Sequence, residues 1–172
     1  MSFDSQYAFN HFYEILQAAP VAVLVTVVSA FLGLFGGMLF CVVRLRRIPV
    51  LNTIVGLLVP LIRSTPILVQ LYVVCYGMPR IVAFVHQNPK FVSNVTIYPN
   101  TVAIVTFTLY ASAYFCEIFR SAYFTVGEGQ RESIKSLNLP AVHAVSRIII
   151  PQAAINAVPN ISNSVIDMLK NT

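Results

Sequence analysis

Long apolar runs separated by short polar stretches dominate the pattern along the chain. Residues 15–43 carry no charged side chain, and further apolar runs follow at 48–62, 67–78, 100–116 and, more weakly, 148–166. A helix that crosses a bilayer needs about 20 predominantly apolar residues, so 15–43 and 100–116 each predict a span. We expect 48–62 and 67–78 to form one broken segment that crosses the bilayer, because neither half is long enough to do so alone.

The last apolar run is unusual because it carries two prolines and three asparagines. Such a segment is a poor lipid-facing helix, since lipid offers no partner for polar groups. We therefore expect 148–166 to lie among other helices and to line a polar path, with Asn160 as one candidate residue of that path.

Charge distribution predicts the orientation of these helices. The chain of 172 residues is 57% hydrophobic and only 10% charged, whereas soluble domains carry about 25% charged residues. Its net charge of +5 does not gather into a nucleic-acid-binding patch, because the basic residues mark the ends of apolar runs. Arg44, Arg46 and Arg47 directly follow the first run and predict a cytoplasmic loop. The sequence therefore predicts a multi-pass membrane protein, with residues 1–17 outside the cytoplasm and a polar outer loop at 79–99.

A charged hairpin is expected between the third and fourth crossings, at 127–147. Residues 128–137 predict a short amphipathic helix, and Pro140 suits the first turn of a second helix. Basic residues in this stretch agree with a cytoplasmic position. Because Glu128 and Glu132 would repel each other mildly, we interpret them as a partner-facing surface and not as an acid–base pair.

The hairpin resembles the coupling loop of the inner-membrane permeases of binding-protein-dependent ABC importers. Members of that family read Gly-Gln-x-Glu-Ala-Ala, then Gly six residues after the Glu, then Ile-Leu-Pro-Gln-Ala. Here the chain has Gly129-Gln130-Arg131-Glu132, and later Ile149-Ile150-Pro151-Gln152-Ala153. The resemblance implies that an ATPase grips these residues: Gly129, Gln130, Glu132, Ser133, Ile134, Lys135, Leu137, Asn138 and Pro151.

Two positions in the hairpin depart from the family pattern. Ser133-Ile134 replaces Ala-Ala, which crowds the first helix slightly. Asn138 stands where the family has the Gly that ends this helix in a left-handed conformation. Asn is the non-Gly residue best suited to that conformation, so we expect the hairpin to form.

A second resemblance lies at the break in the second apolar segment. Arg63-Ser64-Thr65-Pro66 is similar to the Arg-Gly-Thr-Pro of polar amino-acid permeases, and Ser64 and Thr65 are expected to bond backbone carbonyls freed by Pro66. Arg63, Thr65 and Pro66 are therefore candidates for the translocation path. Glu117 and Arg120, one helical turn apart, have two interpretations: a gate or substrate contact, or an ion pair at the interface, which their position favours.

Neither catalytic chemistry nor a metal site is expected on this chain. A phosphate-binding Gly-x-x-x-x-Gly-Lys-(Ser/Thr) loop is missing from the sequence, and its three histidines lie in different segments. Cys41, Cys75 and Cys116 fall inside apolar runs and predict simple packing residues. We therefore expect the chain to be a transport subunit and not an enzyme. A separate feature is the group of small residues Gly33, Gly36 and Gly37, which predicts a flat strip for close helix packing.

The resemblance covers residues 18–172 and implies an all-α, polytopic membrane helix bundle. This is the type I transmembrane domain of ABC importers, with about four of the usual five spans, so the chain looks truncated after Lys170-Asn171-Thr172. It implies an importer of polar amino acids in the bacterial inner membrane, with ATP and Mg bound by partner ATPase subunits. A second permease subunit (the same chain or another) and an extracytoplasmic solute-binding protein would complete it. A non-transporting remnant, a permease for another small solute, and an ion-driven carrier or channel are the alternatives.

Overall fold

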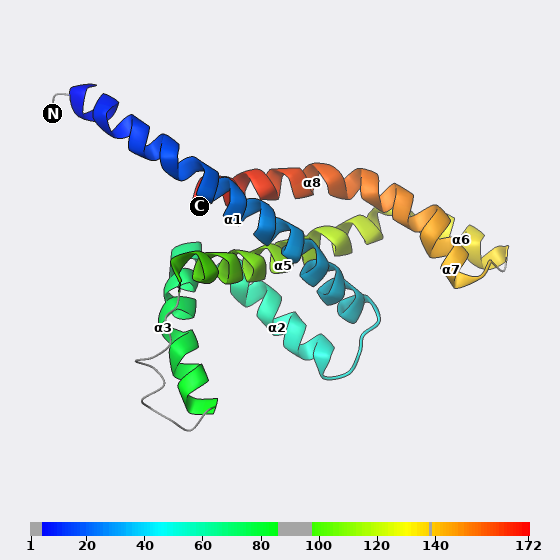
Figure 1. The fold of residues 1–172 in the computed structure, drawn as a ribbon. Coiled ribbons are helices and arrows are strands. Elements are labelled where there is room, and N and C mark those ends of the chain that lie inside the picture. The colour runs from blue at the N-terminus through cyan, green and yellow to red at the C-terminus, as the bar shows by residue number, and fades with distance from the viewer. Residues whose placement is uncertain (1–4, 86–97, 138) are drawn as a thin grey trace.

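The computed structural model describes residues 5–85, 98–137 and 139–172, and these residues form helices without strands. Figure 1 shows a helix bundle from which the start of the first helix, α1 (Ser5–Leu45), projects at one end. The short helices α6 (Glu128–Ser136) and α7 (Ala141–Ala144) lie at the other end.

The central helix is α5 (Pro99–Thr125), which contacts α1, α2 (Leu51–Ser64), α3 (Ile67–Val85) and α8 (Ile150–Asn171). Phe107 and Phe115 of α5 are almost fully buried, and with Val25 of α1 and Met168 of α8 they form one hydrophobic cluster. A second cluster joins α1, α2 and α5. The described part of the chain is therefore organised around α5.

The glycine strip of α1 is the reason that this helix packs so closely on α5. A Cβ added at Gly37 would lie 2.7 Å from the Cβ of Phe115 and 3.0 Å from the backbone nitrogen of Cys116. Gly33 and Gly36 face Ala111 and Ser112 in the same way. The predicted close packing is confirmed, and its partner is α5. Cys41 and Cys116 are buried at this contact as free thiols.

Three helices of the described residues are long and apolar enough to cross a membrane: Leu16–Leu45 within α1, α3 and α5. The expectation that neither half of the second apolar segment could cross alone is wrong, because α3 has 19 residues. It continues through Pro79 to Val85, where the sequence analysis placed a loop. Of the rest of that expected loop, 86–97 lies outside the described residues, and Pro99 is already the first residue of α5.

Helices α5 and α8 also extend further than the apolar pattern predicts. Helix α5 continues to Thr125, beyond the expected end at residue 116, and carries Glu117 and Arg120 in its last turns. Helix α8 has 22 residues and keeps the polar side chains that made this run a poor lipid-facing helix. A π-helix, η1 (Val145–Ile149), joins α7 to α8, so the hairpin continues into α8 without a loop.

Candidate functional site

Pro66 interrupts the helix between α2 and α3, and side chains around it hydrogen-bond the backbone carbonyls at the end of α2. Thr65 adopts an extended conformation, as the residue before a proline prefers. The Oγ atom of Ser64 and the Oγ1 atom of Thr65 donate hydrogen bonds of 3.1 and 2.7 Å to the carbonyl of Leu61. The two hydroxyls therefore bond a carbonyl at the end of α2, as the sequence predicts.

Gln70 completes the break, and sequence reasoning gave it no role. Its Nε2 atom donates hydrogen bonds of 2.8 Å to the carbonyls of Ile62 and Thr65. The Ile62 carbonyl is four residues before Pro66, so an amide N–H at that position would have bonded it in a continuous helix. The side chain of Gln70 replaces this bond and holds the first turn of α3 against the end of α2.

A cavity of about 340 Å³ opens beside this break. Its polar groups come from Thr65, Gln70 and Thr106, the last of which is on α5. Apolar side chains complete the wall: Leu61, Ile62, Val73, Val74 and Leu109. Pockets of this size, mostly apolar with a few placed polar groups, are typical of sites for small molecules.

The residues that the sequence assigned to a translocation path do not all meet in the structure. Arg63, Thr65 and Pro66 are together at the break, where the guanidinium of Arg63 lies 5.1 Å from the ring centre of Tyr114 on α5. Asn160 is exposed on α8, and its Nδ2 atom donates to the carbonyl of Asn156 at 3.0 Å. The roles of these residues in transport stay predictions.

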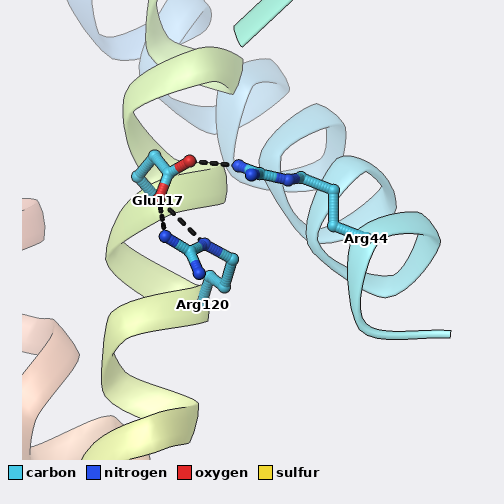
Figure 2. Close-up of polar contacts among 3 residues, drawn as sticks. All are labelled: Arg44, Glu117 and Arg120. Atoms are coloured by element: carbon cyan, nitrogen blue, oxygen red, sulfur yellow. Dashed lines mark hydrogen bonds and ion pairs between the residues drawn. The ribbon is translucent and has the colours of Figure 1, made fainter. Parts of the chain in front are cut away.

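Glu117 and Arg120 form the predicted ion pair, and a third residue joins them (Figure 2). The Nε and Nη2 atoms of Arg120 both lie 2.9 Å from Oε2 of Glu117. Arg44, at the end of α1, pairs with the other carboxylate oxygen through Nη1. The Glu117 side chain is 18% exposed.

Because both oxygens of Glu117 are bound by arginines, the cluster favours a clamp between α1 and α5 over a gate. Its contribution is larger than that of an exposed surface pair, since partial burial limits screening by water and salt. Sequence spacing could reveal the partner one turn away but not Arg44, which is 73 residues distant.

Helix α6 of the hairpin forms nearly where the sequence predicts it and ends in a compact turn. Ser133 accommodates the family's Ala position by donating from Oγ to the Gly129 carbonyl at 2.8 Å. At the helix end, the N–H of Leu137 bonds the carbonyl of Ser133 at 3.0 Å, and the N–H of Leu139 bonds the carbonyl of Ile134 at 3.4 Å. Asn138, for which the sequence predicts a left-handed conformation, lies outside the described residues.

The hairpin exposes apolar side chains that nothing in the described chain covers. Leu137 is 70% exposed and Val142 is 76% exposed, and Glu132 of α6 is exposed as well. Gly129, Gln130 and Ser133 are also at the surface, whereas Ile134 is half-buried. Of the remaining predicted coupling residues, Pro151 is exposed on α8, and the side chain of Lys135 is outside the described set.

The π-helix η1 lies immediately before Pro151. The N–H of Ile150 bonds the carbonyl of Val145, five residues earlier. Pro151 cannot donate a backbone hydrogen bond, and its ring conflicts with the carbonyl of Arg147 in a regular α-helix. Widening the preceding turn is one way to relieve that conflict, and π-turns of this kind are frequent at functional sites.

Known proteins resemble this chain along its full length. The family described as "binding-protein-dependent transport system inner membrane component" matches residues 5–172. The probable amino-acid permease protein YxeN of Bacillus subtilis (strain 168) is 32% identical over 98% of this chain and 71% of its own length. The L-cystine transport system permease protein TcyL of the same organism is 32% identical, over 89% of this chain and 62% of its own length.

The fold is shared with solved transporters. A chain from the crystal structure of an amino acid ABC transporter with histidines superposes with a TM-score of 0.83, at 24% identity, over 99% of this chain and 74% of that one. The inward-facing MetNI methionine ABC transporter gives a TM-score of 0.66 at 18% identity, over 94% of this chain and 73% of that one. The chain therefore belongs to the family of inner-membrane components of binding-protein-dependent transport systems.

Proposed function

We propose that this chain is the permease subunit of an ATP-driven importer of polar amino acids. The main support is the hairpin: its helices α6 and α7 lie at one end of a bundle of apolar helices, and the hairpin exposes apolar side chains there. Similar proteins named as amino-acid and L-cystine permeases support the substrate class. ATP and Mg would bind to partner ATPase subunits, which leaves this chain without hydrolytic chemistry.

Docking of the ATPase would use Leu137 and Val142 as apolar anchors and Glu132 as a charged contact at the rim. Grooves that bind amphipathic helices take such anchors as the main source of affinity. Movement of the ATPase subunits would then displace the hairpin. Because α7, η1 and α8 follow one another without a loop, this displacement would reach the bundle through α8.

Two contacts of α8 would carry the displacement onward. The Nδ2 atom of Asn156 donates to Oγ1 of Thr125 at the end of α5, at 3.0 Å. Met168, further along α8, is fully buried in the cluster with Phe107 and Phe115. A shift of α8 would therefore displace α5, which contributes Thr106 and Leu109 to the wall of the cavity beside Thr65 and Gln70.

That cavity is our candidate for part of the substrate path. The hydroxyl hydrogens of Thr65 and Thr106 and the amide N–H groups of Gln70 already bond backbone carbonyls, so the oxygens of these side chains would accept hydrogen bonds from the ammonium group of an amino acid. Arg63 lies beside the break, and a charged residue within a membrane helix is a functional candidate by default. A second permease subunit and a solute-binding protein would complete the path. In the proposed orientation the N-terminus is outside and the hairpin is in the cytoplasm.

Uptake into proteoliposomes tests the proposal. The full chain is reconstituted with its ATPase and solute-binding protein, and entry of radiolabelled glutamine, histidine, arginine and cystine is followed with and without ATP. Leu137→Asp should abolish ATP-dependent uptake, because it places a charge in the apolar docking contact. Ser136→Asp is the matched control: it adds the same charge at the neighbouring exposed position and should retain most of the uptake. Uptake that persists without ATP or ATPase would contradict the proposal.

A further inference from the structure

A cationic cavity of about 390 Å³ lies beside the Glu117 cluster, at the junction of α1, α2 and α5. Three arginines contribute to its wall, and none of its described wall residues is acidic. The complete wall is Arg44, Leu45, Arg47, Asn52, Arg120, Tyr123 and Phe124. This is a different place from the hairpin and from the cavity at the α2–α3 break.

Glu117 neutralises only part of this charge. Arg44 contacts the Glu117 carboxylate through Nη1, and Arg120 contacts it through Nε and Nη2, as Figure 2 shows. Each guanidinium has five N–H donors, so both arginines keep donors for another acceptor. Arg47 forms no ion pair with an acidic residue in the described part of the chain. The cavity therefore has an excess of two positive charges over the single carboxylate.

The turn that carries Arg47 has an unusual backbone. Arg47 has a φ of 50° and Val50 has a φ of 65°, in the left-handed region that side chains other than Gly rarely adopt. Arg46 and Arg47 are both exposed, but the turn places only Arg47 at the cavity wall. Conformations of this kind gather at ligand sites, where the surrounding structure maintains them.

The surface next to the cavity is apolar. Val42 is 41% exposed and lies one helical turn before Leu45 of the wall, and Leu39, another turn earlier, is 67% exposed. Phe124, which α5 contributes to the cavity wall, is 55% exposed. The guanidinium groups of the cavity therefore lie at the end of the membrane span of α1, next to exposed apolar side chains that can contact lipid acyl chains.

We infer that this cavity binds the phosphate of an anionic phospholipid, with the acyl chains along the exposed apolar residues of α1. Arginine presents paired N–H groups that match two phosphate oxygens, and such contacts are about twice as strong as neutral hydrogen bonds. Basic pockets between membrane helices are known to hold anionic headgroups. A bound lipid would also offset the positive charge gathered around the α1–α5 clamp.

Native mass spectrometry of the purified full chain tests this inference by titration with phosphatidylglycerol and with phosphatidylcholine of identical acyl chains. Arg47→Gln should weaken phosphatidylglycerol binding about tenfold, which corresponds to about 1.4 kcal/mol. Arg46→Gln removes the same charge from the same turn and should leave binding within about twofold of the parent chain. Arg47→Lys keeps the charge without the paired donors, and should give an intermediate loss.

Several results would overturn the inference. Equal loss in Arg46→Gln and Arg47→Gln would mean general attraction to the basic surface. Equal binding of the two lipids by the parent chain would remove the requirement for an anion. Displacement of phosphatidylglycerol by an equal concentration of inorganic phosphate would make a free anion the ligand. Displacement on addition of the ATPase subunit would assign the cavity to that protein. Retention of the lipid in the last two competitions supports the inference.

Discussion

The contact between α1 and α5 depends on the absence of side chains at three glycines of α1. At Gly37, an added Cβ would meet Phe115 and the backbone of α5 at 2.7–3.1 Å. Carbon atoms pack best at about 3.5–4.0 Å, so Gly37→Ala would force the helices apart locally by about 1 Å. Backbone atoms cannot rotate out of the way, and the separation would open the packing around Phe115 and Cys116.

We expect Gly37→Ala to cost about 1–3 kcal/mol from overpacking. The higher helix propensity of Ala offsets at most about 1 kcal/mol of this cost. With the full offset, the net loss is up to about 2 kcal/mol, which should lower the unfolding temperature by up to about 8 °C, using the relation for chains of this length. Thermal unfolding of a fluorescent fusion in detergent, followed by size-exclusion chromatography, measures the change.

Two other glycines provide matched controls. A Cβ at Gly56 of α2 or Gly77 of α3 would meet no atom within 4 Å. Gly56→Ala and Gly77→Ala should therefore be neutral or slightly stabilising. If Gly37→Ala behaves like these two changes, the close approach of α1 and α5 is wrong.

A double-mutant cycle tests the same contact at Gly33, where the obstacle is the Cβ of Ala111. Gly33→Ala should destabilise the chain, and Ala111→Gly in that background should recover part of the loss by removing the opposing methyl group. Additive effects of the two changes would show that the residues do not touch.

Three further predictions concern the clamp, the helix break and the hairpin. Glu117→Gln should destabilise the chain by about 1–3 kcal/mol in thermal unfolding, because Arg44 and Arg120 lose a partly buried partner; an unchanged unfolding temperature would argue against the clamp. Gln70→Leu should reduce stability by about 1–3 kcal/mol, since the Thr65 carbonyl loses its bond from Nε2 and the Ile62 carbonyl keeps only the 3.4 Å bond from the Thr65 N–H; Gln70→Glu, which also lacks the amide donor, should be no milder. Glu132→Lys should weaken copurification of the ATPase without changing thermal unfolding, and full retention of the ATPase would exclude a docking role for this residue.

Local chemistry explains what could be read from the sequence. Pro66 and its hydroxyl-bearing neighbours define the helix break whatever their surroundings, and Glu117 and Arg120 are one turn apart on any helix. The same reasoning failed at Pro79, which was interpreted as a helix end. Membrane helices tolerate interior prolines, and Pro20, Pro60 and Pro159 also lie within helices here.

What the sequence could not reveal depends on tertiary geometry. Arg44 reaches Glu117 only because α1 lies against α5, a contact that no local pattern contains. Gln70 is close to Ile62 along the chain, but its bond requires the particular angle between α2 and α3. The π-turn before Pro151 likewise could have been a kink or a break on sequence grounds alone. For Arg44 and Gln70, the sequence shows the residue but not the group that it contacts in the fold.

The position of the hairpin relative to the membrane tests the central claim most directly. One cysteine is added at Ser136 of α6 or at Tyr98, which precedes α5, so that the two sites lie at opposite ends of the α5 region. The parent chain, with its own three cysteines, gives the background labelling. A membrane-impermeant maleimide applied to intact cells should label Tyr98→Cys strongly and Ser136→Cys only after the membrane is opened. Labelling of Ser136→Cys from outside sealed cells would contradict the account.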